Sequence, residues 1–161
     1  MVGPYDRQPQ NHGPRGGSGP RGPGGPGGGE TVTMPKPDDI RYFVDADRRR
    51  PNAALVGEQA EELAQSIAAT PASQIRRFYG DVLAIGRRSG ISDEAICTQM
   101  ALLKAKAAYA SGRKQIPREL LKFFVSHAAA VTDRTSYEAF RRVFEAVIAY
   151  HKFYETKRPG N

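Results

Sequence analysis

The last long apolar segment, Tyr137 to Tyr154, constrains the fold most tightly. At about 100° per residue, its apolar side chains form two adjacent stripes along one helix. The first stripe is Tyr137, Phe140, Phe144, Val147, Ile148 and His151, and the second is Ala139, Val143, Ala146, Tyr150 and Phe153. A helix at the edge of a small bundle needs one apolar face, so the second is either buried in the same chain or offered to a neighbour. We interpret the second stripe as a sign of an assembly subunit.

Capping and helix-breaking residues predict five helices. The predicted segments are Asn52 to about Ala69, Thr70-Pro71 to Gly90, Ser92-Asp93-Glu94 to Gly112, a fourth starting at Pro117, and a fifth ending before Pro159. Gly57 is a weak spot in the first helix, and Thr135 with Glu138 has the spacing of a capping box for the fifth. No stretch shows sustained two-residue alternation. The predicted fold class is therefore all-α, a small bundle of about five helices.

Composition separates the N-terminal part of the chain from this bundle. Residues 1–30 hold 11 of the 17 Gly and 6 of the 12 Pro. Such a segment cannot bury enough apolar surface to offset roughly 1–2 kcal/mol of backbone entropy per residue. We predict a disordered Gly/Pro-rich tail over residues 1–37, with the helical bundle over residues 52–157. The Gly-Pro-Arg units leave an RNA-binding tail as the alternative, but a solvated tether is favoured because residues 1–30 contain three arginines and one aromatic residue.

The segment between tail and bundle, residues 38–51, mixes apolar and basic residues. Its apolar residues include Tyr42 and Phe43, and Arg48-Arg49-Arg50 follows them. A linker and an arm that docks on a neighbour both remain open for this segment.

The basic charge belongs to the helical part as well as to the whole chain. From Leu63 to the end there are 16 Lys and Arg against 8 Asp and Glu, which gives +8, while the chain as a whole carries +7. A polyanionic partner is the natural inference, because neutralising phosphates releases counterions and drives binding that does not depend on sequence. A soluble basic surface without a partner is the alternative interpretation.

The second predicted helix has a core stripe and an opposite basic face. Its core stripe is Ile75, Phe78, Val82 and Ile85. On the other side, Arg76 and Arg87 lie within about 20° of each other around the axis, with the small residues Ser73, Gly80 and Ala84 on the same face. Arg77 and Arg88 form a parallel row. Small residues between cations let a phosphate backbone approach, so we predict that this face positions a nucleic acid. A solvated helix face is the alternative.

Residues that carry chemistry are few. Cys97 with His127 or His151 is a weak candidate for a nucleophile and base, because His151 falls on the core stripe and a catalytic triad needs geometry that spacing does not supply. No Cys/His group has zinc spacing, and no glycine-rich loop joins a strand to a helix. We therefore expect a protein that is not an enzyme and binds no metal or cofactor. A lone cysteine and the absence of an apolar leader favour the cytoplasm.

Three blocks of the sequence carry a family resemblance. The blocks are Gln74 to Tyr79, Leu102 to Arg113, and Phe144 to Lys152. Together, in this order, they resemble the small helical subunit of the type III-A CRISPR interference complex, the Csm complex. The resemblance does not reach residues 1 to about 50. The small subunit of the type III-B complex and a free-standing basic helical nucleic-acid-binding protein are the alternatives.

The resemblance implies a function in antiviral defence. In that family a few copies stack head to tail beside the guide-binding ridge subunits, hold the guide RNA–target RNA duplex by its phosphates, and contact the large polymerase-like subunit. By motif position the duplex-facing role falls on Arg76, Arg77, Lys104, Lys106 and Arg113. Arg87 joins them because it shares a face with Arg76. Lys104 points nearly opposite Lys106, so these cations cannot all contact one ligand.

Overall fold

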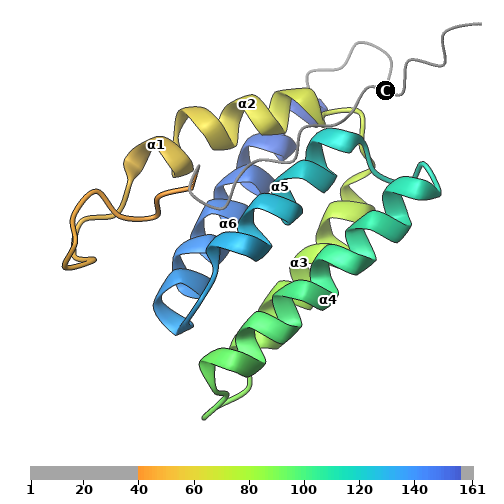
Figure 1. Cartoon of the computed structure of the whole chain (residues 1–161). Coiled ribbons are helices and arrows are strands. Elements are labelled where there is room, and N and C mark those ends of the chain that lie inside the picture. The colour runs from red at the N-terminus through yellow and green to blue at the C-terminus, as the bar shows by residue number, and fades with distance from the viewer. Residues whose placement is uncertain (1–39, 157–161) are drawn as a thin grey trace, which may run out of the picture. The chain divides into compact units, whose positions relative to one another are not determined.

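The computed structural model describes residues 40–156, which belong to the second of two units, Met1–Val32 and Thr33–Asn161. The tail predicted over residues 1–37 lies outside the described residues. Within the described range the elements are all helices, shown in Figure 1. They are α1 (Ala53–Val56), α2 (Glu58–Ser66), α3 (Ala72–Gly86), α4 (Asp93–Gly112), α5 (Arg118–Ala130) and α6 (Arg134–Thr156). The all-α prediction is confirmed, and the one pairing of extended backbone among these residues is an isolated bridge between Phe43 and Pro51.

The first predicted helix is interrupted at its weak spot. Asn52 caps α1 as predicted, because its side-chain oxygen accepts a hydrogen bond from the Ala54 amide at 3.2 Å. Gly57 then leaves helical geometry, with φ −97° and ψ −108°, and separates α1 from α2. The prediction of one continuous helix to about Ala69 is therefore wrong, since α2 ends at Ser66.

The next two helices begin where the sequence predicts. Ser92 caps α4 through a 3.2 Å bond from the Ala95 amide to its hydroxyl, and α4 ends at Gly112. The prediction that Gly90 closes the preceding helix is wrong, because α3 ends at Gly86. Gly90 lies instead in the connection to α4, where its φ of +69° suits a residue without a Cβ.

The capping box predicted for the last helix is also wrong. Because α6 already begins at Arg134, Thr135 lies inside it. Asp133 and Ser136 cap the helix instead. The Ser136 amide donates a hydrogen bond to the Asp133 carboxylate at 2.8 Å, and the Ser136 hydroxyl accepts one from the Asp133 amide at 3.1 Å. This is the reciprocal pattern of a capping box, shifted by two residues. Glu138 pairs with Arg134 and Arg141 on the helix surface.

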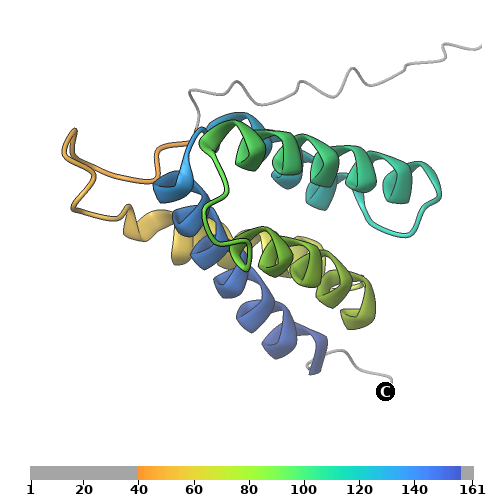
Figure 2. The same ribbon diagram turned by 90° about the horizontal axis from the view of Figure 1, so that it is seen from below.

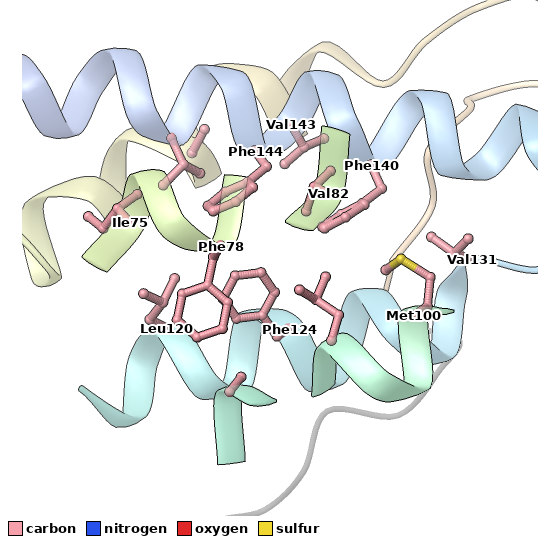
Figure 3. Packing of buried hydrophobic residues seen from close by; sticks show 14 of the residues in the cluster. Ile75, Phe78, Val82, Met100, Leu120, Phe124, Val131, Phe140, Val143 and Phe144 are labelled. Carbon is pink, nitrogen blue, oxygen red and sulfur yellow. The ribbon is translucent and has the colours of Figure 1, made fainter. Parts of the chain in front are cut away.

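Aromatic side chains from three helices form the centre of the core. The rings of Phe78 and Phe124 lie 4.8 Å apart, and Phe124 meets the edge of Phe144 at 5.3 Å. Figure 3 shows Phe78 of α3, Phe124 of α5 and Phe144 of α6 converging, with Leu120 beside them. Phe124 and Phe144 are fully buried. The predicted core stripe of α3 is confirmed, since Ile75, Phe78, Val82 and Ile85 are all buried.

Both apolar stripes of α6, except Phe153 near its end, are covered within the chain. The helix packs against α1, α2, α3 and α4 (Figures 1 and 2). Val143 of the second stripe is buried, and Ala139, Ala146 and Tyr150 pack partly buried against the core. Phe153, near the end of the helix, is exposed. The second stripe is therefore explained by α1 and α2, and it gives no support to the interpretation that it serves an assembly.

The segment before α1 packs against the bundle of its own chain. Tyr42 is buried, and its hydroxyl lies 2.7 Å from Nδ1 of His127 in α5. Arg48 forms an ion pair with Asp133 at 2.5 Å, at the start of α6. The Asn52 amide donates to the Tyr42 carbonyl at 2.8 Å and closes the segment on itself. This arm, residues 40–52, thus packs on the bundle of its own chain.

Candidate nucleic-acid interface

The outer face of α3 carries arginines at both ends. Arg76 and Arg77 lie in its second turn, and Arg87 and Arg88 follow its last residue. Arg87 keeps right-handed helical backbone angles, φ −71° and ψ −16°, so the turn continues past the helix end. All four side chains belong to exposed residues. At 1.5 Å rise per residue the two pairs are about 16 Å apart along the axis.

Small residues occupy this face, Gly80 and Ala84 between the two arginine pairs and Ser73 one turn before the first pair. Ser73, Gly80 and Ala84 are exposed on this face. A Cβ placed on Gly80 meets no atom within 4 Å, so no packing inside this chain requires a glycine there. A helix interior pays roughly 0.5–1 kcal/mol for glycine relative to alanine. Because the side chains between the arginines are small, the backbone of a partner can approach the helix closely there.

The arginines of this face have no fixed partner among residues 40–156. Within this range, no hydrogen bond or ion pair involves the side chain of Arg76, Arg77, Arg87 or Arg88. One acid is near: a hydrogen bond from Lys152 and, to a smaller extent, the charge of Arg76 hold the pKa of Glu155 below its usual value. The guanidinium groups therefore remain available for an external anion.

The cations predicted on α4 are exposed but differently placed. Lys106 lies across from α3 and pairs with Asp81 at 2.9 Å. Arg113 donates a 2.8 Å hydrogen bond to the Tyr109 hydroxyl, one turn earlier on the same helix. Lys104 lies about 160° around the helix from Lys106, as the sequence predicts. The structure thus brings Lys106 toward the arginines of α3 and leaves Lys104 on another side.

A groove runs between α3 and α4. Its volume is about 730 Å³, and Arg77, Arg88 and Lys106 are among the residues that line it. Asp81 faces the same groove. Helical spacing predicts that Arg77 and Arg88 lie in one row, and in the structure both residues line the groove. The Asp81 contact with Lys106 could not be found from the sequence, because the two residues lie on different helices.

The residues weighed for catalysis are held apart in separate interactions. The Cys97 thiol lies 3.6 Å from the Val131 carbonyl. His127 bonds Tyr42, and Nε2 of buried His151 lies 3.0 Å from the Thr70 carbonyl. Burial lowers the pKa of His127 to about 3. Within residues 40–156, no three His, Cys, Asp or Glu side chains gather as a possible metal site. The same stretch contains no helix with the length and apolar character that crossing a membrane requires.

The comparison with protein families agrees with the placement of the three sequence blocks on α3, α4 and α6. The family described as Csm2 of type III-A matches residues 50–157. No curated protein and no solved structure matches the chain. The family match spans all six helices and begins within the arm. The chain therefore belongs to the Csm2 family, the small structural subunits of type III-A CRISPR complexes.

Proposed function

We propose that this small subunit binds the guide RNA–target RNA duplex through its phosphates, with the outer face of α3 as the contact surface. Arg76, Arg77, Arg87 and Arg88 hold the backbone, and Lys106 and Arg113 extend the positive surface on α4. Lys104 serves another contact, because it lies on a different side of α4. The subunit has no catalytic part in this proposal. It works in the cytoplasm as one component of a larger antiviral complex.

One observation carries this proposal: four exposed arginines, none with a hydrogen bond or ion pair to another described residue, flank a stretch of small residues on the helix surface. A guanidinium group is always charged and offers a planar set of donors that matches phosphate. Contacts of this kind fix the register and orientation of a nucleic acid but do not read its bases. The expected binding is accordingly strong in its salt dependence and weak in its sequence preference.

The size of the surface favours several copies acting together. Two arginine pairs about 16 Å apart reach only a few phosphates, so one copy binds weakly. Linking copies along one duplex raises the effective concentration and supplies avidity. An interface between unlike surfaces of identical subunits extends instead of closing, which suits a chain of copies following a helical ligand. The exposed alanines of α4, Ala101, Ala105 and Ala108, permit close contact with a neighbouring subunit. Guide-binding ridge subunits and the large polymerase-like subunit are the other proposed partners.

The test is an affinity measurement with a charge-matched control. Arg76→Ala with Arg77→Ala removes two charges from the α3 face, and Arg49→Ala with Arg50→Ala removes two from the exposed tip of the arm. We expect the α3 variant to weaken binding of two RNA duplexes of unrelated sequence by a similar factor, roughly tenfold if each contact contributes about 0.7 kcal/mol. The arm variant should lose much less. If both variants lose affinity equally, the loss reflects net charge alone and the α3 face is not the specific contact surface. If the α3 variant loses no affinity, the assigned face is refuted.

A further inference from the structure

The groove between α3 and α4 has an apolar floor beneath its charged rim. Phe78 and Ile85 of α3, with Leu103 and Ala110 of α4, line it and retain 3–6% exposure, whereas their neighbours Val82, Met100 and Ala107 retain none. Its open volume is about 730 Å³. Helices α3 and α4 run beside one another over this region in Figures 1 and 2. A flat apolar group can therefore enter between two rows of polar side chains.

Tyr109 forms an exposed aromatic wall of this groove. Its residue is 64% exposed, the highest value among the large apolar side chains of residues 40–156. Arg113 Nη1 donates to its hydroxyl at 2.8 Å, and the Arg113 guanidinium carbon lies 5.6 Å from the ring centre. Arg113 thus holds the ring by a hydrogen bond to its hydroxyl and a cation–π contact, and no other ring of the described residues packs on it. Leu102, two turns earlier on the same side of α4, is also exposed at 52%.

We infer that the groove receives an unpaired nucleobase of the bound RNA, which stacks on Tyr109. This inference rests on the proposed binding of RNA phosphates by α3. An aromatic face beside cations is the combination that single-stranded nucleic acids use, because every base has a flat apolar face and a charged phosphate attached to it. Arg77 and Arg88 are positioned on the rim for that phosphate. The charge of Asp81, which would repel it, is paired with Lys106.

A base can reach Tyr109 only when it has left its stack. In a continuous A-form duplex the bases are stacked and paired, and side chains meet the backbone and groove edges. The ligand feature assigned to this groove is therefore a bulged, mismatched or single-stranded nucleotide next to the duplex held by α3. Because every base has a flat face that can stack on an aromatic ring, we expect no strong preference among the four bases.

The experiment compares two RNA duplexes of the same length, one fully paired and one with a single unpaired 2-aminopurine. The full-length protein should bind the second roughly fivefold or more tightly, the lower end of the effect of one stacked base. The fluorescence of the 2-aminopurine should be quenched on binding. Tyr109→Leu should bring the ratio of the two affinities close to one, and Tyr109→Phe, which keeps the ring, should preserve it.

The outcomes separate this inference from the proposed function. If the parent protein binds both duplexes equally, or if Tyr109→Leu keeps the preference, the base-binding groove is refuted while phosphate binding stands. If Arg76→Ala with Arg77→Ala leaves both affinities unchanged, the phosphate-binding face itself is wrong. If Tyr109→Leu changes neither affinity but prevents association with another protein subunit, the groove is a protein contact and the inference is overturned.

Discussion

Two glycines of α3 stand in opposite surroundings. Gly80 is exposed, and a Cβ there meets nothing. At Gly86 a Cβ would lie 2.7 Å from the Tyr137 hydroxyl oxygen. That hydroxyl is fixed, because Tyr137 is fully buried and donates to the Val82 carbonyl at 2.7 Å. Gly86 therefore allows α3 and α6 to pack closely, whereas Gly80 leaves the outer face of α3 without a protruding side chain at that position.

The two sites predict opposite effects of the same substitution. Gly80→Ala should raise the free energy of unfolding by roughly 0.5–1 kcal/mol, because alanine has the higher helix propensity. Gly86→Ala should lower it by about 1–3 kcal/mol, because the rigid Tyr137 side chain must shift in a packed core. Urea unfolding of both variants measures the difference. A neutral result for Gly86→Ala would show that α6 moves to accept the methyl group.

His127 makes the stability of the fold depend on pH. Its imidazole is buried against Phe123 and Phe140, and desolvation by burial lowers its pKa to about 3. In the unfolded chain the group protonates near pH 6.5. Between these values the unfolded state binds more protons, so the free energy of unfolding falls as the pH falls.

The expected loss from this histidine is up to about 1.4 kcal/mol for each pH unit below 6.5. From pH 7 to pH 5 it amounts to about 2 kcal/mol. His127→Asn keeps an acceptor near the position of Nδ1 for Tyr42 but removes the titrating group. Urea unfolding at pH 7, 6 and 5 should show a shallower pH dependence for the variant than for the parent. Equal slopes would show that His127 is not the group responsible.

At the scale of elements, the groove between α3 and α4 contains one carboxylate, Asp81, among the cations Arg77, Arg88 and Lys106. The pair of Lys106 and Asp81 is exposed, with side chains 59% and 37% accessible, so it contributes little to stability. Its larger effect is on the ligand, because the carboxylate offsets one cation on the face assigned to RNA.

Asp81→Asn should therefore tighten RNA binding. The expected gain is about 1.4- to fivefold at low salt, from the roughly 0.2–1 kcal/mol typical of exposed charge pairs. The melting temperature should change by no more than a few degrees. Glu62→Gln, on the exposed surface of α2, removes the same charge elsewhere and should leave the affinity nearly unchanged. A looser complex for Asp81→Asn would show that Asp81 orients Lys106 for the ligand.

The sequence predicted the elements better than their ends. Helical spacing placed Phe78 and Val82 correctly because it depends only on local geometry. The Asp133 and Ser136 cap was missed because Thr135 and Glu138 satisfy the same spacing, and only the start of the helix decides between them. The docking of Tyr42 on His127 was also out of reach, since these residues are far apart in the chain and meet only in the folded state.

For the candidate site, helical spacing was again the most informative feature of the sequence. It grouped Arg76 with Arg87 and separated Lys104 from Lys106, and the exposure of all four residues agrees with a surface role. The groove and its ion pair required the relative placement of two helices, which depends on how the core packs. Whether these cations contact RNA stays a prediction.

At the scale of the whole molecule, an aromatic core maintains the fold, and the surface of α3 and α4 is the part assigned to RNA binding. Phe78 lies at the centre of the aromatic core and also under the groove. Phe78→Ala should cost roughly 3–5 kcal/mol in the free energy of unfolding, enough to unfold a marginally stable domain. Thermal unfolding measures it. A folded Phe78→Ala protein with weakened RNA binding would show that this ring serves the ligand more than the core.

The most direct test of the central claim is the salt dependence of RNA-duplex binding when all four arginines of α3 are replaced by alanine. Each phosphate contact contributes about 0.9 to the slope of log affinity against log salt on a B-form duplex, which serves as a guide for RNA. We predict that the slope becomes shallower by about two or more while the melting temperature stays close to that of the parent. An unchanged slope in a folded variant would contradict the claim that the outer face of α3 binds the RNA backbone.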